Sequence, residues 1–427
     1  MNTNSGDHLQ LIALLNDMFD AAVDAALPDN NIAGFLPQKP VGRTIVIGAG
    51  KATAAMARAV EQNWTSGISG LIIVPHGDHP QCKQIEIAQA SHPVPDAAGE
   101  AAAKRMLNMV SNLSEDDLVL SLISGGGSAL LSLPGAGITL ADKQQINTAL
   151  LKSGAAIDEM NCVRKHLSAL KGGRLAAAAY PARVVTLAIS DVPGDDPAVI
   201  ASGPTVLNTS TREQALSIID RYKIALPESV EKLLNSDNAS TPDVNDVRMS
   251  KVETHVICKP QQSLEAAATI AEAAGLHPLI LGDAIEGEAC EVGKVMAGIA
   301  KQVLKYDQPV KKPAVLISGG ETTVTIKSKG GRGGRNAEFL LGFADAAAEC
   351  NHFYALSADT DGIDGTEDNA GVIWSPTIAK KAQSLGLKQS TYLDNNDAWS
   401  FFNAANGLVM RGPTHTNVND FRAIIIV

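Results

Sequence analysis

Aromatic side chains are scarce in this 427-residue chain, at 4% of all residues, while hydrophobic residues reach 45%. A core of this composition must be built from Ala, Val, Ile and Leu, and such chains usually bury parallel strands between helices. No apolar run approaches the ~20 residues needed to cross a bilayer, and the N-terminus lacks the basic segment of a secretory signal. These absences predict a cytoplasmic α/β protein of two or three domains with no membrane partner.

The sequence also lacks a surplus of positive charge, since its formal net charge is −11. A nucleic-acid partner is therefore not expected, because phosphate backbones require clustered surplus Lys and Arg. The five cysteines include no CxxC pair, which argues for reduced thiols and against a disulfide or zinc framework. A local basic pocket for one small anion is still compatible with this charge. The oligomeric state stays open, a homodimer included.

Short apolar runs alternate with helical patterns, and most of the runs end in a glycine-rich or acidic tip. The predicted strands are 45–47 (tip GAGK), 118–123 (SGGGS), 183–189 (SDVPGDD), 314–317 (SGGE) and 353–356 (SADTDG). In parallel α/β sheets, ligands bind beyond the carboxyl ends of strands, where helix N-termini offer N–H groups. The tips together therefore predict one or two clefts, although each alone is also an ordinary turn.

A polar segment rich in Asn, Asp and Ser, residues 227–251, indicates a domain boundary. We predict one domain over 1–240 and a second over 241–427. The C-terminal strand either stays in the second domain or returns to the first. Helical patterns are predicted at 96–110, 142–155, 264–274 and 288–303.

The tip Gly48–Lys51, which contains Gly50, fits neither common nucleotide-binding fingerprint. Thr53 stands where GxGxxG needs its third glycine, no acidic residue follows about 20 residues later, and Ala52 breaks the Walker A pattern. The glycines alone are consistent with a plain turn. Lys51, however, lies in the first turn of a predicted helix, where the helix dipole disfavours a cation unless it faces an anion. We therefore predict a phosphate or carboxylate contact for Lys51.

Two further segments have the composition of anion-binding turns. The sequence SGGGS at 124–128 offers successive unhindered N–H groups and two hydroxyls, with a tight turn as the alternative. Arg164, Ser168 and Lys171 would share one face of a helix, with a solvated basic face as the alternative. The Lys-Gly-Gly-Arg that starts at Lys171 suits a closing anion-binding turn.

Other polar residues are grouped near the remaining tips. Asp191 and Asp195 follow the strand 183–189, the setting that Mg²⁺ requires, with a loop-capping role as the alternative for Asp191. The second acidic cluster, around Asp361, lacks calcium-loop spacing. Residues 327–338 (KSKGGRGGRNAE) favour a loop that clamps a phosphoryl group, with a basic surface hairpin as the alternative. Residues 412–420 (GPTHTNVND) precede an apolar terminus and predict a last strand that presents its polar side chains to the cleft.

These blocks together resemble the class II glycerate kinases, a family whose C-terminal part is called the MOFRL domain. The matching blocks are IGAGKA (47–52), SHPVPD (91–96), ISGGGSALL (123–131), VRKHLSALKGGRLA (163–176), ISDVPGDDPAVIASGPT (189–205), ISGGETTV (317–324), GGRGGRNAE (330–338), ADTDGIDGTEDNAG (358–371) and THTNVND (414–420). The resemblance covers nearly the whole chain. Ala337 and His415 depart from it, since the family pattern has Gln and Gly at these positions.

The resemblance implies transfer of the ATP γ-phosphoryl group to the 2-hydroxyl of D-glycerate with Mg²⁺, giving 2-phospho-D-glycerate. It implies a large Rossmann-like three-layer domain with a mainly parallel sheet, a smaller α/β (MOFRL) domain, and an active site in the cleft between them. Lys51 and Arg335 would be the catalytic cations. The implied substrate- or phosphate-binding residues are Gly50, Ser124, Gly125, Gly126, Gly127, Ser128, Arg164, Lys171, Arg332, Asn336, Thr416, Asn417 and Asn419, and the implied metal ligands are Asp191, Asp195, Glu321 and Asp361.

Two other functions stay open at this stage. An NAD(P)H-dependent hydroxypyruvate reductase would act on nearly the same carbon skeleton, but the missing third glycine and ribose-binding acid count against a nicotinamide cofactor. A non-catalytic sugar-acid-binding module would bind its ligand without turnover. Phosphoryl transfer fits better, because it needs charge neutralisation and positioning rather than a strong covalent nucleophile.

Overall fold

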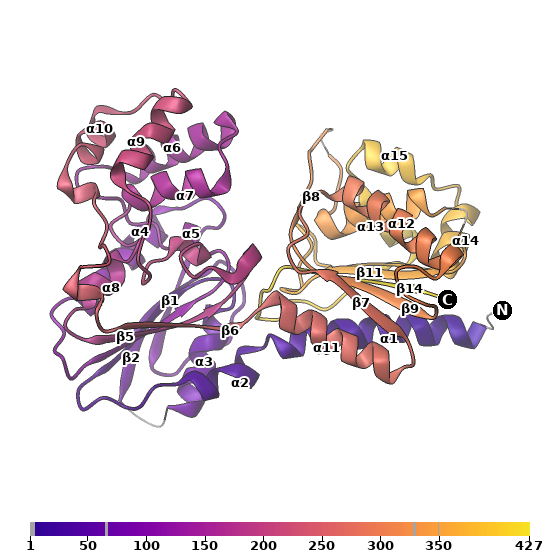
Figure 1. Ribbon diagram of the computed structural model, residues 1–427, viewed down its shortest axis with the longest axis horizontal. Coiled ribbons are helices and arrows are strands. Elements are labelled where there is room, and N and C mark those ends of the chain that lie inside the picture. The colour runs from indigo at the N-terminus through magenta and orange to yellow at the C-terminus, as the bar shows by residue number, and fades with distance from the viewer. Residues whose placement is uncertain (1–4, 65–66, 328–329, 349) are drawn as a thin grey trace. The chain divides into compact units, whose positions relative to one another are not determined.

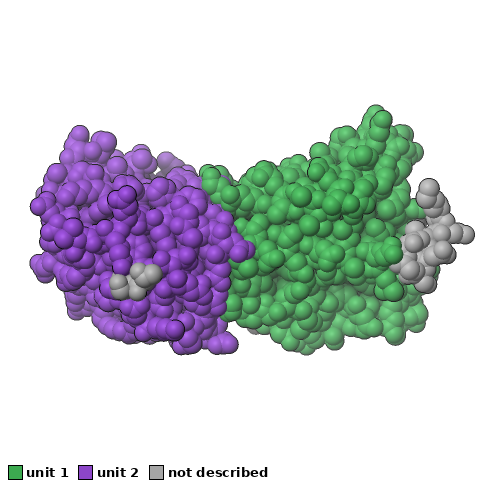
Figure 2. All heavy atoms as spheres, turned by 90° about the horizontal axis from the view of Figure 1, so that it is seen from below, with its two compact units in different colours: residues 1–27, 192–194, 259–427 green, residues 28–191, 195–258 purple. Residues whose placement is uncertain are grey.

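The chain folds into two compact units in a computed structural model that describes residues 5–64, 67–327, 330–348 and 350–427 (Figure 1). Unit 1 comprises Met1–Leu27, Val192–Gly194 and Lys259–Val427, and unit 2 comprises Pro28–Asp191 and Asp195–Cys258 (Figure 2). Each unit is built around its own six-stranded sheet.

The sheet of unit 2 is entirely parallel, with strand order β3-β2-β1-β4-β5-β6. Its strands are β1 (Thr44–Ala49), β2 (Ile68–Pro75), β3 (Ile85–Ala90), β4 (Leu118–Ile123), β5 (Arg183–Ile189) and β6 (Val252–Cys258). β1 and β4 are buried along their whole length, which is why they form continuous apolar runs in the sequence. The strand order reverses between β1 and β4, and ligands of such sheets bind at the carboxyl ends of strands at this point.

Helices cover both faces of this sheet, with α3 and α4 on opposite sides (Figure 1). The helices near the sheet are α2 (Pro28–Asn31), α3 (Thr53–Asn63), α4 (Ala97–Val110), α5 (Gly127–Leu130) and α8 (Arg174–Ala179). Asp96 caps α4 by accepting a hydrogen bond from the Gly99 N–H at 2.9 Å. The predicted Rossmann-like three-layer arrangement is confirmed for unit 2.

A second group of helices in unit 2 has a core of its own. It consists of α6 (Leu140–Ser153), α7 (Ile157–His166), α9 (Arg212–Arg221) and α10 (Glu228–Leu234), which pack around Ile146, Val163 and Leu233. Thr139 is the N-cap of α6: its hydroxyl accepts from the Asp142 N–H while the Asp142 carboxylate accepts from the Thr139 N–H. This reciprocal cap fixes the start of the helix that carries Lys143.

The sheet of unit 1 is mixed, with strand order β13-β12-β11-β14-β9-β7. Its strands are β7 (His277–Gly282), β9 (Ala314–Ser318), β11 (Phe353–Asp359), β12 (Gly371–Trp374), β13 (Leu408–Val409) and β14 (Asp420–Ile426), and β8 (Gly287–Glu288) pairs separately with β10 (Thr322–Thr323). β14 runs antiparallel to both β9 and β11. The C-terminal strand therefore lies inside the sheet of unit 1 and does not return to the other unit.

The helices of unit 1 include the N-terminal one. They are α1 (Ser5–Ala25), α11 (Pro260–Ala273), α12 (Ala289–Tyr306), α13 (Arg335–Ala346), α14 (Pro376–Ser384), α15 (Gln389–Asp394) and α16 (Ala398–Ala405). α1 buries Leu15, Met18 and Phe19 in the same apolar core as Leu264 of α11, and the Phe19 ring centroid lies 5.9 Å from that of Phe421. Short 3₁₀ helices occupy Ile32–Phe35, Pro193–Asp195, Ile200–Ser202, Asp237–Ala239 and Val247–Met249.

The units differ from the predicted domains 1–240 and 241–427 at three places, one of which is the short segment Val192–Gly194 that belongs to unit 1. The division falls after Cys258, because β6 extends the parallel sheet of unit 2 beside β5. The N-terminal helix belongs with residues 259–427, because its apolar face packs on α11. The predicted strands 45–47, 118–123, 183–189, 314–317 and 353–356 fall on β1, β4, β5, β9 and β11, and the predicted helices 96–110, 142–155, 264–274 and 288–303 overlap α4, α6, α11 and α12. Within the described residues, no helix has both the length and the hydropathy to span a membrane.

Candidate active site

The carboxyl ends of β1 and β4 lie side by side in unit 2, where the strand order reverses. Ala49 pairs in register with Ile123, so the GAGK tip and the SGGGS turn follow neighbouring strands. The Lys51 N–H donates to the Gly125 carbonyl oxygen at 2.8 Å, and the Ser124 N–H donates to that of Ala49 at 3.2 Å. The structure thus brings Gly50, Lys51 and the five residues 124–128 together at the expected ligand position of a parallel sheet.

Ser124 shapes this turn from the inside. Its fully buried hydroxyl accepts from the Ala52 N–H at 3.1 Å and lies 3.1 Å from the hydroxyl of Thr53. Thr53 stands at the third glycine position of the dinucleotide fingerprint, and this hydroxyl contact is one that glycine could not make. The contact between the Thr53 and Ser124 hydroxyls ties the start of α3 to the SGGGS turn.

The side chain of Lys51 lies beside the glycine turn. Gly126 has a φ of +79°, a region that residues with a side chain rarely adopt. A Cβ at Gly126 would lie 3.6 Å from Lys51 Cγ and 3.1 Å from the His92 ring. α3 begins at Thr53 with Ala52 as its N-cap, so Lys51 precedes the helix rather than lying in its first turn. His92 was not among the predicted site residues, although the SHPVPD block contains it.

Ser128 connects the turn to a buried lysine. Lys171 Nζ donates to Ser128 Oγ at 2.8 Å and also to the Ser128 carbonyl oxygen. Ser128 Oγ lies 2.8 Å from Ser202 Oγ. Burial is the largest cause of the lowered pKa of Lys171, whose residue is only 4% exposed. A lysine so desolvated favours an anion as its neighbour.

Arg164 and Lys171 do not share a helix face as predicted. α7 ends at His166, so Arg164 lies on the helix while Lys171 lies in the turn after it. Arg164 Nε donates to Asn147 Oδ1 at 3.0 Å. The two cations are nevertheless close enough that the charge of Arg164 lowers the pKa of Lys171, after burial and Lys143.

The carboxylates predicted to hold Mg²⁺ in unit 2 are Asp191 and Asp195. Asp195 Oδ1 is buried and has no hydrogen-bond partner among the described residues, which fits a carboxylate oxygen available for a cation. No cluster of three or more His, Cys, Asp or Glu side chains suited to a metal occurs in the described part of the chain. Mg²⁺ takes only one or two protein carboxylates beside phosphate and water oxygens, so these residues fit the ion.

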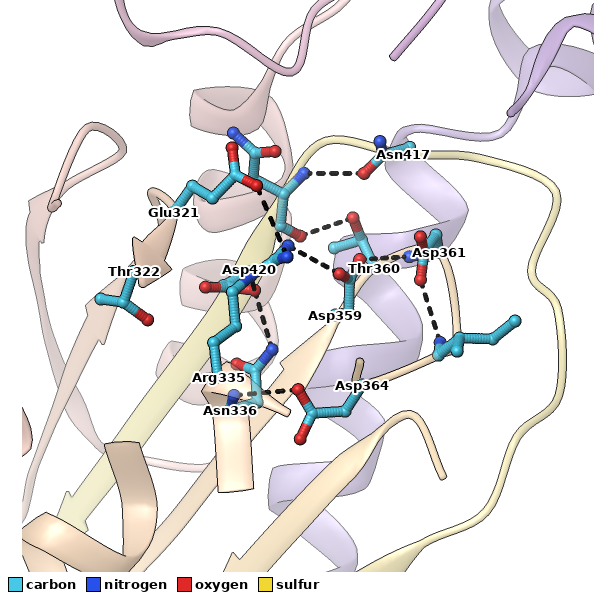
Figure 3. A network of polar contacts seen from close by, with 12 residues as sticks. Glu321, Thr322, Arg335, Asn336, Asp359, Thr360, Asp361, Asp364, Asn417 and Asp420 are labelled. Carbon is cyan, nitrogen blue, oxygen red and sulfur yellow. Dashed lines mark hydrogen bonds and ion pairs between the residues drawn. The ribbon is translucent and has the colours of Figure 1, made fainter. Parts of the chain in front are cut away.

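In unit 1, Arg335 lies among three carboxylates at the start of α13 (Figure 3). Its Nε donates to Asp420 at 2.8 Å, one terminal nitrogen donates to Asp359 at 2.7 Å, and the other lies 3.4 Å from Glu321. Asp359 and Asp420 are register partners on β11 and β14, where like charges repel unless a cation bridges them. Burial opposes the charge of Arg335, but attraction by Asp420, Asp359 and Glu321 raises its pKa.

Asn336 is held within the same network. Its Nδ2 donates to Asp420 at 2.7 Å, and its Oδ1 accepts from the Ser357 hydroxyl at 2.6 Å. Asp364 accepts the backbone N–H groups of Asn336 and Ala337, each at 2.9 Å, and so satisfies the N-terminus of α13. Burial raises the pKa of Asp364 to about 6.

The glycine-rich segment 327–338 leads into α13. Arg332 pairs with Glu367, and its guanidinium carbon lies 3.7 Å from the ring centroid of Trp399. Ser328 and Lys329, which contribute to the predicted clamp, lie outside the described residues. Arg332, which lies in the loop part of this segment, is therefore already paired with a carboxylate.

Thr416 lies in a loop and not on the predicted last strand, because β14 begins only at Asp420. The Thr416 hydroxyl donates to the Ala26 carbonyl oxygen at 2.6 Å and ties this loop to the end of α1. His415 has a φ of +64°, which explains why the family pattern has glycine at this position.

Asn417, Asn419 and Asp361 also precede or follow strands as loop residues. Asn417 Oδ1 accepts from the Asn419 N–H at 3.2 Å, and the Asn419 carbonyl oxygen accepts from the Thr360 hydroxyl at 2.7 Å. Asp361 Oδ1 accepts from the Ile363 N–H at 2.9 Å. These contacts hold the loops at the ends of β11 and β14 in shape (Figure 3).

Unit 2 places glycine N–H groups and lysines at the reversal of a Rossmann-type sheet, which is the arrangement of α/β enzymes that bind anionic small molecules. Residues 14–235 match a family model described as a domain of unknown function, DUF4147, and residues 314–420 match the MOFRL family.

Curated relatives and solved structures agree with these matches. A D-glycerate 2-kinase of Thermotoga maritima is 40% identical over 99% of this chain and 100% of its own length. A protein of Agrobacterium vitis with the provisional name hydroxypyruvate reductase is 50% identical over 97% of this chain and 94% of its own. A crystal structure of glycerate kinase from Thermotoga maritima has a TM-score of 0.89 and covers 98% of this chain and 100% of that chain. The chain belongs to the class II glycerate kinase family, as the resemblance predicted.

Proposed function

We propose that the protein transfers the γ-phosphoryl group of ATP to the 2-hydroxyl of D-glycerate, giving 2-phospho-D-glycerate and ADP. The observation that carries this proposal is the position of Lys51 beside the SGGGS turn, where β1 and β4 end and the sheet order reverses. Phosphoryl transfer is catalysed mainly by positioning and charge neutralisation. Lysines and glycine N–H groups at one strand edge supply both.

Each residue has a distinct part in this proposal. Lys51 neutralises the phosphoryl group in transfer, and the N–H groups of Gly125 and Gly126 bind its oxygens, since those of Ser124 and Gly127 already donate to the Ala49 and Ser124 carbonyl oxygens. Arg335 orients the glycerate carboxylate through one terminal nitrogen of its guanidinium. This nitrogen makes the longest of the three carboxylate contacts, 3.4 Å to the half-exposed Glu321, and is therefore the most available for a ligand. Asp191 and Asp195 would hold Mg²⁺, which would neutralise negative charge on the phosphates of the donor.

The test is turnover by the purified protein with D-glycerate, ATP and Mg²⁺, with ADP measured by a coupled assay. We expect ADP to form with D-glycerate and to be nearly absent with L-glycerate or without acceptor. Equal ADP formation in all three mixtures would mean that the protein is not a glycerate kinase.

Hydroxypyruvate reduction is the second candidate, because a 50% identical relative carries that name. The structure gives no support for a nicotinamide site at the first strand tip, since Thr53 fills the third glycine position and His76 follows the end of β2. Incubation with hydroxypyruvate and NADH or NADPH tests it. Oxidation of either cofactor without ADP formation from D-glycerate and ATP would favour the reductase.

A further inference from the structure

Four cationic side chains of unit 2 form a cluster at Lys171, which contacts the SGGGS turn through Ser128. Lys143 comes from α6, Arg164 and Lys165 come from α7, and Lys171 comes from the turn that follows. Lys143, Lys165 and Lys171 are only 7%, 8% and 4% exposed. Each of the other three contributes to lowering the pKa of Lys171, after burial itself, which shows that their charges lie close to it.

Neutral oxygens are the hydrogen-bond partners of this cation cluster. Lys143 Nζ donates to the Leu133 carbonyl oxygen at 3.5 Å, Arg164 donates to Asn147, and Lys171 donates to Ser128. Among the described residues, none of the four forms an ion pair with a carboxylate. The acidic groups that act on them from further away are Glu100 on Lys143 and Asp196 on Lys165.

Arg174 shows what a structural cation in the same region looks like. Its guanidinium donates to the carbonyl oxygens of Lys165 at 2.7 Å and Ala239 at 2.6 Å, and to Ser240 at 3.1 Å. These bonds hold the end of α7 against a neighbouring loop. Within the part of the chain that the structure describes, Lys143 and Lys165 have no comparable set of bonds, so holding the fold together does not explain their burial.

Burial of unpaired like charges destabilises a folded protein. Burial lowers the pKa of Lys143 to about 8 and also lowers that of Lys165. A well-packed apolar side chain of similar size would be more stable at either position. Groups kept at such a cost to stability are typical of binding sites, where the ligand supplies the missing opposite charge.

We propose that Lys143, Arg164, Lys165 and Lys171 bind the polyphosphate chain of the nucleoside triphosphate, so that unit 2 holds the phosphoryl donor. This inference rests on the proposed kinase function. D-glycerate carries a single carboxylate, whereas a triphosphate carries several negative charges and matches the four cations. Lys171 and Lys51 approach the same turn, at Ser128 and Gly126, so the terminal phosphoryl group has a place beside Lys51.

A hollow next to the cation cluster offers room for the nucleoside. It has a volume of about 480 Å³, and its lining includes Asn161, Lys165, Asn208, Ser210 and Ile218. Pockets of roughly 300–1,000 Å³ with a few polar groups are usual for small molecules of this size. Lys165 lines both the hollow and the cluster, so a nucleoside in the hollow would direct its phosphates toward the lysines.

The first test measures the steady-state kinetics of Lys143→Met and Lys165→Met. Methionine keeps most of the side-chain volume and removes the charge. We expect KM for ATP to rise at least about tenfold, because each loses a charge-assisted contact, while KM for D-glycerate stays within about twofold. Lys152→Met is the matched control, since Lys152 lies exposed on the same helix as Lys143; it should leave both constants unchanged. An unchanged KM for ATP, or an equal rise in both constants, overturns the proposal.

Thermal unfolding without ligand separates binding from a structural role. If the lysines only support the fold, both variants will melt below the wild type. We expect them to melt at the same temperature or higher, because the substitution removes an unpaired buried charge. A lower melting temperature in both variants contradicts the proposal.

Ligand-induced shifts in melting temperature test the site without requiring turnover. Inorganic tripolyphosphate and ATP should each stabilise the wild type and fail to stabilise Lys143→Met. ATP should stabilise the wild type more than tripolyphosphate does; equal shifts would exclude a nucleoside in the hollow. If the wild type phosphorylates D-glycerate but both ligands stabilise the variant as strongly as the wild type, the donor site is wrong and the kinase function stands. If the wild type binds both ligands through these lysines but shows no turnover, the kinase function is wrong instead.

Discussion

The two units treat their buried cations in opposite ways. Arg335 of unit 1 lies within hydrogen-bond distance of two buried carboxylates and near a third. Lys171 of unit 2 is buried more deeply than Arg335, but its partners are the hydroxyl and carbonyl oxygens of Ser128. A cation among carboxylates is already neutralised and stabilises the fold, whereas a cation with neutral partners is available to neutralise a ligand. The difference separates Arg335, whose loss should harm stability as well as turnover, from lysines whose loss should harm ligand binding without harming stability.

The largest effect is expected for Arg335→Ala. This change leaves Asp359 and Asp420 opposite each other on neighbouring strands without a bridging cation. We expect a loss of about 3–5 kcal/mol in the free energy of unfolding together with loss of turnover, because a buried pair is broken from one side. Denaturant unfolding measures the first and the ADP assay the second. Arg335→Lys keeps the charge but not the planar fork, so its stability and turnover should lie between those of the wild type and those of Arg335→Ala. Native stability in Arg335→Ala would show that Arg335 does not stabilise unit 1 by bridging the two carboxylates.

Lys51→Ala should abolish activity and leave the fold intact. Loss of a donor to a transferring group typically lowers kcat by about 10²–10³-fold. The free energy of unfolding should stay within about 0.5 kcal/mol of the wild type. Lys83→Ala, at an exposed position of the same unit, is the control and should keep full activity. A Lys51→Ala enzyme with near-native kcat would remove Lys51 from the site.

The pH dependence of stability in unit 1 depends on its buried acids. Burial raises the pKa of Glu338 to about 7 from an ordinary value of 4.5, with Glu288 and Asp364 adding to the rise against Lys327 and Asn396. Between these two values the folded protein binds more protons than the unfolded chain, so its stability falls as pH rises through this window. Glu338→Gln should therefore stabilise the protein at pH 8, by on the order of 2 kcal/mol, and change little at pH 4.5.

Unfolding curves of Glu338→Gln at the two pH values measure this difference. Glu286→Gln is the control, because Glu286 is exposed in the same unit. A stabilisation that is the same at both pH values would show that the carboxyl group of Glu338 does not titrate in this window.

The smallest effect is expected for Glu367→Gln. This change breaks the ion pair with Arg332, whose side chain is 51% exposed. Partly exposed pairs of this kind contribute about 0–1 kcal/mol, and the stacking of Arg332 on Trp399 is kept. The melting temperature and KM values should barely change. A large fall in KM for either substrate would show that Glu367 competes with a ligand for Arg332, and would place Arg332 in the site.

Much of this architecture is predictable from local sequence. The runs 118–123 and 183–189 coincide with β4 and β5, because a strand buried on both faces must be mostly apolar. The glycine-rich tips mark strand ends, because close backbone approach at such ends requires small residues. The pairing of Lys51 with the SGGGS turn follows from these two signals.

Other features depend on contacts between distant segments. The direction of β14 and the burial of α1 beside it are set by packing within unit 1, which a local pattern does not encode. Asp420, a partner of Arg335, lies 85 residues away in the chain. Lys143 has the appearance of an ordinary polar position in α6, and only the packing of α6 beside α7 and the turn after it buries the lysine.

The most direct test of the proposed function is identification of the product by phosphorus NMR. The wild type is incubated with D-glycerate, ATP and Mg²⁺, and the new phosphate ester is correlated with the protons of the glycerate carbons. The account predicts one ester whose phosphorus couples to the single proton on C2. An ester coupled to the two protons on C3, or no ester at all, would contradict it.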